Sequence, residues 1–292
     1  MMNEYVIVSD ATLDLPINII EEHKISVIPM GVSIDDAEYT HYPDERELNI
    51  ADFYSKLKNG ATSHTSQITP IKFIEFFGEI LKSGKDIIYI GFSSGLSGTF
   101  QAAQLAKQEL TQDYPNQKIY CIDSLCASVG EGLLVLQAAM KKKSGMDLEE
   151  LKNWVEENKL KVRHWFTVKD LFYLKRGGRI SSIEAFVGTA LKIKPVLSTD
   201  EAGKLVVLSK IRGNKAELDY LFTKLQTEGT DLTNQTVIIG HGDDLAQAQE
   251  LEKLIRSKEA VKDVIITNIG PVIGTHTGPG MLALVYSGNQ SE

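Results

Sequence analysis

Hydroxyl and glycine residues crowd into segment 91–99, whose sequence is Gly-Phe-Ser-Ser-Gly-Leu-Ser-Gly-Thr. The segment follows a β-rich run at 87–90 and precedes a helical pattern that begins at Thr99. In an open α/β sheet, ligands bind at the carboxyl ends of the strands. The N-terminus of the following helix adds unpaired N–H groups and a partial positive charge. We therefore expect an anion site in this loop, for a phosphate, a sulfate or a carboxylate.

Two further segments carry side chains that suit the same kind of group. Residues 62–67 include Thr65 and Ser66 and precede the start of a predicted helix, although alone the segment is typical of a polar loop. Residues 270–280 place glycines and prolines on both sides of His276. Because glycine and proline favour tight, fixed backbone conformations, we expect a rigid turn that presents His276 to a ligand.

The glycine-serine loop also matches the G-x-S-x-G pattern of serine hydrolases, with Ser93 at the nucleophile position. His241 or His276 would then be the general base, and Asp243 would orient it. A nucleophile elbow enters its helix directly after the serine, whereas two further glycines delay the helix here. A serine esterase is therefore an alternative interpretation that the spacing disfavours.

The composition excludes several classes of function. The 292 residues include 31 Lys plus Arg and 39 Asp plus Glu, and the net charge of −8 is a poor match to the phosphate backbone of nucleic acids. The sequence contains no nucleotide-binding glycine pattern and no zinc-ligand pattern, and two cysteines are too few for a disulfide scaffold. No apolar run reaches the roughly 20 residues that cross a bilayer, and no signal-peptide pattern is seen. We expect a cytoplasmic protein without a metal or other cofactor.

Strand and helix patterns alternate along the first half of the chain. Strands are predicted at 5–9, 25–30, 87–90 and 119–122, and helices at 17–20, 70–82, 99–110, 129–143 and 147–159. This alternation predicts a mainly parallel sheet covered on both faces. Further on, the sequence predicts strands at 162–168, 237–239, 264–266 and 281–286, a hairpin at 196–208 and a helix at 244–256. We therefore predict an α/β domain at 1–160 and an α+β domain at 161–292.

Five short blocks stand in order along the chain. They are Val-Ser-Asp-Ala-Thr-Leu-Asp at 8–14, Thr-Ser-Gln at 65–67, Ser-Ser-Gly-Leu-Ser-Gly-Thr at 93–99, Gly-Gly-Arg-Ile at 177–180 and His-Thr-Gly-Pro-Gly at 276–280. Together they resemble the DegV family of bacterial fatty-acid-binding proteins, over essentially the whole chain. The departures are Ala11, where the family commonly has serine, and Ile68, where it usually has proline. Neither position is expected to contact a ligand.

The resemblance implies a Rossmann-like N-terminal domain, a C-terminal α+β domain and one acyl chain in a tunnel between them. It implies that Thr65, Ser66 and Ser97 hold the fatty acid carboxylate, with His276 nearby. The protein would then be a lipid-binding protein and not itself an enzyme, with the bound fatty acid as its ligand.

The resemblance also implies a protein partner. Members of the family present the fatty acid to a separate ATP-dependent fatty acid kinase, which converts the carboxyl group to an acyl phosphate for phospholipid synthesis. An acyltransferase is a conceivable later partner. Arg212 matches a position tied in the family to kinase engagement, and Arg179 matches the family's basic glycine turn, with a role in partner docking or phosphate binding. A lipid-binding regulatory protein without a kinase partner is the remaining alternative.

Overall fold

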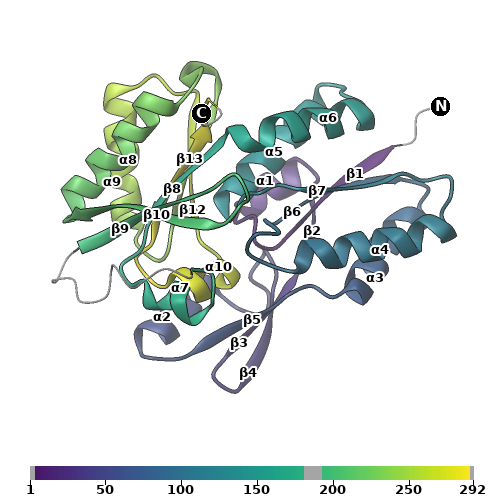
Figure 1. The fold of residues 1–292 in the computed structure, drawn as a ribbon, viewed down its shortest axis with the longest axis horizontal. Coiled ribbons are helices and arrows are strands. Elements are labelled where there is room, and N and C mark those ends of the chain that lie inside the picture. Colours follow the sequence, from purple (N-terminus) through teal and green to yellow (C-terminus); the bar gives the residue numbers. More distant parts are fainter. Residues whose placement is uncertain (1–3, 181–192, 290–292) are drawn as a thin grey trace.

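The computed structural model describes residues 4–180 and 193–289. It has two lobes, with the N-terminal strands on the right and the green and yellow C-terminal sheet on the left of Figure 1. The N-terminal lobe contains a parallel sheet in the order β2–β1–β6–β7. Its strands are β1 Tyr5–Asp10, β2 Ser26–Ile28, β6 Asp86–Gly91 and β7 Ile119–Asp123. Its helices are α1 Ile17–Glu22, α3 Pro70–Lys82, α4 Thr99–Asp113, α5 Val129–Lys143 and α6 Leu148–Asn158. The predicted α/β architecture is therefore confirmed.

The C-terminal lobe is built on a six-stranded mixed sheet in the order β10–β9–β8–β13–β11–β12. Its strands are β8 Val162–Thr167, β9 Ile193–Thr199, β10 Leu205–Arg212, β11 Thr236–His241, β12 Asp263–Asn268 and β13 Leu282–Ser287. The helices of this half are α7 Phe172–Arg176, α8 Asn214–Glu228, α9 Leu245–Lys258 and α10 Pro271–Thr277, with short 3-10 turns η1 Lys159–Lys161 and η2 Leu232–Asn234. The β11–β12 pair is parallel and the other neighbours are antiparallel. This is the predicted α+β pattern, including the β9–β10 hairpin.

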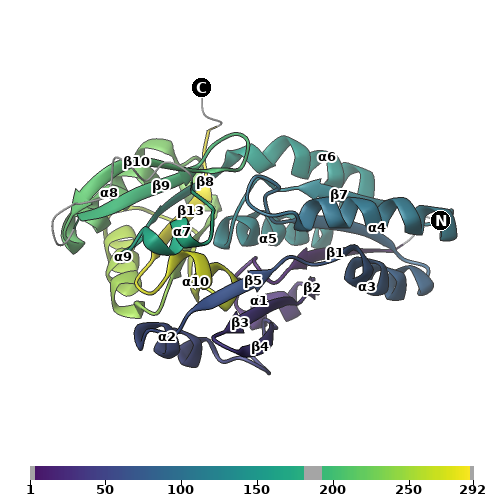
Figure 2. The ribbon, with the colours of Figure 1, turned by 60° about the horizontal axis from the view of Figure 1, so that its bottom comes forward.

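A third, antiparallel sheet was not predicted. It has the order β4–β3–β5, with β3 Met30–Ile34, β4 Ala37–His41 and β5 Ser63–Ser66, and α2 Ile50–Lys58 lies next to it. Figure 2 shows this sheet and α2 below α10. The strand predicted at 25–30 is wrong as a single element, because β2 and β3 belong to different sheets on the two sides of Pro29, which has no N–H to donate to a ladder. The polar loop predicted at 62–67 is likewise wrong, because β5 pairs with β3 there.

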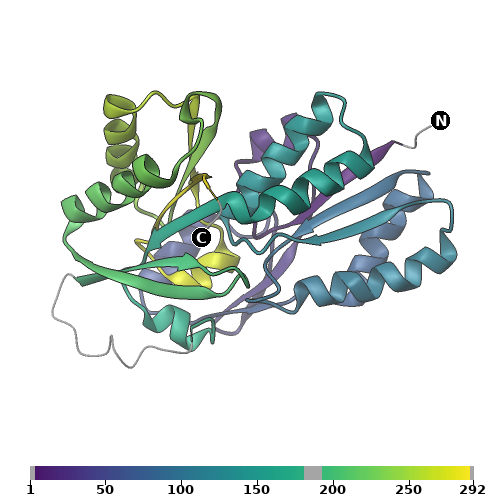
Figure 3. The same ribbon diagram turned by 45° about the horizontal axis from the view of Figure 1, so that its top comes forward.

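Helix α5 is shared by both lobes (Figure 3). It contacts β8, β11 and β13 of the six-stranded sheet and β1 and β6 of the parallel sheet. Almost every residue from Val129 to Ala139 is buried, as expected of a helix that is apolar on all sides. Buried Glu131 on this helix accepts hydrogen bonds from Ser9 at 2.8 Å and Thr12 at 2.7 Å. The domain boundary near residue 160 stays a prediction, although every strand of the six-stranded sheet follows it.

Candidate functional site

A partly open cavity lies between the two lobes. Apolar side chains from both halves of the chain form most of its wall, among them Phe92, Val129, Phe166, Leu174 and Ile273. The predicted ligand space between the lobes therefore exists.

The parallel sheet directs three of its loops to this cavity. β2 lies on one side of β1 and β6 on the other, which makes the carboxyl ends of β1 and β6 the switch point where α/β sheets bind ligands. Thr12 follows β1, Leu96 follows β6 and Ala127 follows β7, and all three line the cavity. Asp10 fixes two of these loops, because its carboxylate accepts hydrogen bonds from the backbone N–H of Phe92 at 3.2 Å and of Thr12 at 3.2 Å.

Thr65 and His276 meet at one end of the cavity. Thr65 Oγ1 lies 2.9 Å from His276 Nε2, although the two residues are 211 positions apart. Burial, together with the positive charges of Arg179 and Arg176, lowers the pKa of His276 to about 4. The imidazole is therefore uncharged at neutral pH, and this pair offers neutral hydrogen-bonding groups to the cavity.

The rigid turn predicted around His276 is wrong, because Pro271–Thr277 forms helix α10. Pro271 occupies the first helical position, where the missing N–H costs nothing, and Gly278 ends the helix with φ 72°. The glycine turn after α7 packs against the histidine ring, since a methyl group built on Gly177 would lie 2.1 Å from His276 Nδ1. This Nδ1 atom is buried and has no hydrogen-bond partner among the described residues.

Ser97 and Ser66 both border the cavity. Ser97 Oγ donates to Thr99 Oγ1 at 3.0 Å and accepts from the Thr99 backbone N–H at 3.2 Å at the start of α4. Ser66 follows Thr65 in β5, so its side chain lies on the opposite face of the strand, where its Oγ would be 2.5 Å from a methyl group on Gly31. The carboxylate-binding roles of these two serines stay predictions.

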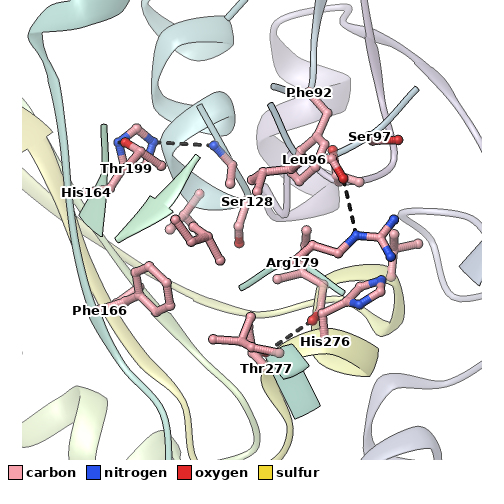
Figure 4. A pocket seen from close by; sticks show the side chains of 18 of the residues that line it. Phe92, Leu96, Ser97, Ser128, His164, Phe166, Arg179, Thr199, His276 and Thr277 are labelled. Atoms are coloured by element: carbon pink, nitrogen blue, oxygen red, sulfur yellow. Dashed lines mark hydrogen bonds between the residues drawn. The ribbon is translucent and has the colours of Figure 1, made fainter. Parts of the chain in front are cut away.

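Arg179 lines the cavity near His276 (Figure 4). Its Nε donates to the carbonyl oxygen of Leu96 at 3.2 Å, and its Nη1 donates to the carbonyl oxygen of Gly177. Burial lowers the pKa of this guanidinium, which nevertheless stays charged because arginine titrates far above neutral pH. The side chain joins the glycine-serine loop of one lobe to the glycine turn of the other.

Arg212 does not reach the cavity. It is the last residue of β10 and is exposed. The structure thus separates the two arginines of the sequence prediction: Arg179 lies at the cavity, and Arg212 lies on the surface.

The opposite end of the cavity contains two residues that the sequence analysis did not assign, His164 and Thr199 (Figure 4). His164 Nδ1 lies 3.2 Å from Thr199 Oγ1, and His164 Nε2 accepts a long hydrogen bond of 3.5 Å from the backbone N–H of Ala127. Burial lowers the pKa of His164 to about 4. The ring packs directly on α5, since a methyl group on Gly130 would lie 1.7 Å from Nε2. No sequence pattern joins these residues, because they meet only when β8 and β9 pair.

Ser93 is not arranged as a nucleophile. Its fully buried hydroxyl donates to the carbonyl oxygen of Gly203 at 2.8 Å and accepts from the N–H of Gly95 at 3.1 Å. The two candidate bases have other partners: His276 pairs with Thr65, and His241 Nδ1 accepts from the backbone N–H of Asp244. Asp243 forms an ion pair with Lys58. The geometry therefore argues against the esterase.

Among residues 4–180 and 193–289, no three His, Cys, Asp or Glu side chains form a group that could hold a metal ion. Within the same residues, no helix is both long and apolar enough to cross a membrane.

The fold and the cavity define a class of protein: two α/β lobes that enclose a mostly apolar space with a neutral histidine–threonine pair at each end. The family model described as "Uncharacterised protein, DegV family" matches residues 4–289. A DegV domain-containing protein of Clostridium perfringens is 42% identical over 291 residues, which cover 100% of both chains. The chain belongs to the DegV family.

Solved structures agree with this assignment. DegV of Bacillus subtilis, described as a fatty acid binding protein, is 32% identical, with a TM-score of 0.84 over 99% of this chain and 100% of its own. A DegV lipid binding protein of Thermotoga maritima is 30% identical, with a TM-score of 0.85 over 99% and 100% of the two chains. The two-domain fold is therefore that of the family.

Proposed function

We propose that this protein binds a long-chain fatty acid and presents its carboxylate to a separate ATP-dependent fatty acid kinase. The observation that carries the proposal is the mostly apolar cavity between the lobes, with Thr65, Ser97, Arg179 and His276 at one end of it. The fatty acid binding of the Bacillus subtilis relative supports the same ligand.

The energetics of burial favour a long acyl chain. Each buried CH₂ group contributes roughly 0.8 kcal/mol, so a chain of about sixteen carbons contributes on the order of 10 kcal/mol before the costs of association. An unpaired carboxylate at the end of such a chain would be expensive to bury. The ligand therefore belongs with its tail among the apolar side chains and its head at the Thr65–His276 end.

Hydroxyl groups would hold the head group. When His276 carries its proton on Nε2, it donates to Thr65 Oγ1, and the Thr65 hydroxyl proton is free to bond a carboxylate oxygen. This tautomer also leaves a lone pair, and not an unsatisfied N–H, on the buried Nδ1. Ser97 would supply a second hydroxyl from the glycine-serine loop, and Arg179 a positive charge nearby.

The kinase would supply ATP, because the sequence contains no nucleotide-binding pattern. A carboxylate oxygen would attack the γ-phosphorus, the bond from that phosphorus to the β,γ-bridging oxygen would break, and acyl phosphate and ADP would form. Exposed Arg212 would dock the kinase or bind its phosphates, because a guanidinium group forms charge-assisted hydrogen bonds with carboxylates and phosphates. The acyl phosphate would then enter phospholipid synthesis, with an acyltransferase as a later partner.

Ligand loading tests the first half of the proposal. The purified protein is denatured, and its organic extract is quantified by mass spectrometry, with about one acyl chain per molecule expected. Ser97→Ala should weaken oleate binding about tenfold or more, because a hydrogen bond to a charged group is worth about 1.5–3 kcal/mol. Ser94→Ala is the matched control, since this serine is exposed and does not line the cavity. Absence of a copurified chain, together with no uptake of added palmitate or oleate, would refute fatty acid binding.

Acyl phosphate formation tests the second half. With kinase and ATP added, the Arg212→Ala protein should keep its bound fatty acid but should form much less acyl phosphate. The acyl phosphate is measured by trapping it with hydroxylamine. Lys215→Ala, a change of an exposed cation on the next helix, should behave like wild type. If Arg212→Ala loses the ligand, the separation of roles is wrong. If the loaded wild type yields no acyl phosphate, the regulatory alternative replaces the kinase role.

A further inference from the structure

A second, partly open cavity is lined by residues that differ from those of the first. Three segments form it: the loop after β1 with the start of α1, the segment from the end of β4 to α2, and the end of β12 with the residue before α10. These segments come from both lobes. The proposed fatty acid binding makes no use of this space.

Two polar side chains come close to Gly270 at the wall of this second cavity. Asp14 and His41 both line it, and a methyl group built on Gly270 would lie 2.7 Å from Asp14 Oδ1 and 2.7 Å from His41 Nε2. His41 is only 4% exposed, yet its Nδ1 has no hydrogen-bond partner among the described residues. Buried polar atoms in native proteins nearly always have partners, which are often bound water or ligand.

The charge of the second cavity favours a cation. Its described lining includes two acidic residues, Asp14 and Glu45, and no lysine or arginine. The Glu45 carboxylate also accepts hydrogen bonds from Asn49 and from the backbone N–H of Ile50 at the start of α2. Burial raises the pKa of Asp14 to about 7 despite hydrogen bonds from Ser128 and Gly270, so its anion lacks a compensating charge. His41 is neutral near pH 7, because burial lowers its pKa to about 4.

Apolar side chains complete the wall. Leu15, Ile17, Ile50 and Ile266 lie around the polar pair, and the amide side chain of Asn268 stands at the end of β12. A metal ion does not suit such a wall, and the described residues contain no group that could hold one. A ligand with an ammonium group and a small apolar body matches both the acidic and the apolar side chains of the lining.

We propose that the second cavity binds a small primary amine, with its ammonium group at Asp14 and His41 and its apolar body against the leucine and isoleucine side chains. Bound amine would contact both lobes. It would also affect the fatty acid cavity, because Asp14 accepts a hydrogen bond of 2.5 Å from Ser128, which lines that cavity. Asp14 and Ser128 both have positive φ, at 49° and 54°, so this link is held in a restricted backbone geometry.

The test uses protein already loaded with oleate, so that the first cavity is filled. The probes are 3-methylbutylamine and its uncharged isostere 3-methyl-1-butanol, titrated while the backbone amides of Gly270 and Asn268 are followed by NMR. We expect saturable shifts of these amides with the amine and binding at least about tenfold weaker with the alcohol. Asp14→Asn should weaken amine binding at least about tenfold, whereas Asp36→Asn, an exposed carboxylate in the β3–β4 turn, should not.

Equal binding of amine and alcohol would overturn the proposal, as would a folded Asp14→Asn protein that binds the amine like wild type. No shift at Gly270 or Asn268 up to about 10 mM amine would do the same, since that limit corresponds to negligible affinity. If the Asp14→Asn protein fails to fold, Glu45→Gln is the second variant. It removes the other negative charge of the lining and should weaken amine binding several-fold. Fatty acid loading is measured separately on each variant, so failure of the proposed function is distinguishable from failure of this site.

Discussion

The contact between Thr65 and His276 brings two uncharged hydrogen-bonding side chains together at the cavity, where they could hold a carboxylate without a tight ion pair. Burial keeps the imidazole uncharged, and the donors of Arg179 assigned in this structure go to backbone carbonyl oxygens of Leu96 and Gly177. An adjacent opposite charge strongly lowers the basicity of a carboxylate, whereas hydroxyl donors lower it less. Such a site would suit the proposed function, in which the carboxylate acts as a nucleophile.

Replacing Thr65 by valine tests this pair, because valine has nearly the same shape and lacks the hydroxyl. We expect oleate to bind about 10- to 100-fold more weakly to Thr65→Val, as follows from the loss of one hydrogen bond to a charged group. Isothermal titration calorimetry on delipidated protein gives the affinity. Thr62→Val, just before the same strand, is the control and should bind like wild type. Unchanged affinity of Thr65→Val would remove Thr65 from the carboxylate site.

At the scale of elements, the β9–β10 hairpin forms part of the wall of the cavity between the lobes. Thr199 and Leu205 at its two sides line the cavity. Its turn is held on the glycine-serine loop of the other lobe by the hydrogen bond from Ser93 to Gly203. Contact there is close, since a methyl group on Gly95 would lie 2.5 Å from the carbonyl oxygen of Ala202.

Gly203→Ala should loosen this contact. Gly203 has φ 70°, which alanine adopts poorly, and the added methyl group would lie 2.0 Å from Ser93 Oγ. We expect faster release of bound fatty acid, measured by stopped-flow transfer of a fluorescent fatty acid to vesicles. Ser93→Ala removes the hydrogen bond to Gly203, together with the one from the Gly95 N–H, without adding a methyl group at the turn, and should show the same change to a smaller extent. A release rate equal to wild type in both variants would show that the hairpin contact does not retain the ligand.

Local patterns predicted the elements that depend on local sequence. The loop at 91–98 was predicted correctly between β6 and α4, because strand, glycine-rich loop and helix follow one another there. The pairing of Thr65 with His276 came only from the family resemblance, since no local signal joins residues 211 positions apart.

Other features depend on tertiary contacts and escaped prediction. Helix α10 is seven residues long and contains one glycine and four β-branched residues, so its intrinsic helix propensity is low and packing must stabilise it. The contact of His164 with Thr199 requires the pairing of β8 with β9, and strand pairing is not encoded in the hydrophobic period.

Across the whole molecule, buried ionisable groups shift stability with pH in opposite directions. His41, His164 and His276 have pKa values lowered from 6.5 to about 4, so their contribution to stability is lost as pH falls from about 6.5 to about 4. Asp14 has a pKa raised from 3.8 to about 7, so its contribution is present at low pH and is lost as pH rises to about 7. Because three histidines oppose one aspartate, these groups should make the protein more stable as pH rises from about 4 to about 6.5, and Asp14 should offset only part of this rise.

Asp14→Asn should remove the contribution of Asp14 to the pH dependence of stability. Asparagine keeps an oxygen for the Gly270 N–H and an amide group for Ser128, but it does not titrate. The difference in free energy of unfolding between wild type and variant should therefore shrink by on the order of 3 kcal/mol between about pH 5 and about pH 7.5. Urea unfolding of delipidated protein at the two pH values measures it, with Asp36→Asn as the control for an exposed carboxylate. A difference that stays constant with pH would mean that Asp14 is ionised in the folded protein, and that its burial is compensated by groups other than Ser128 and Gly270.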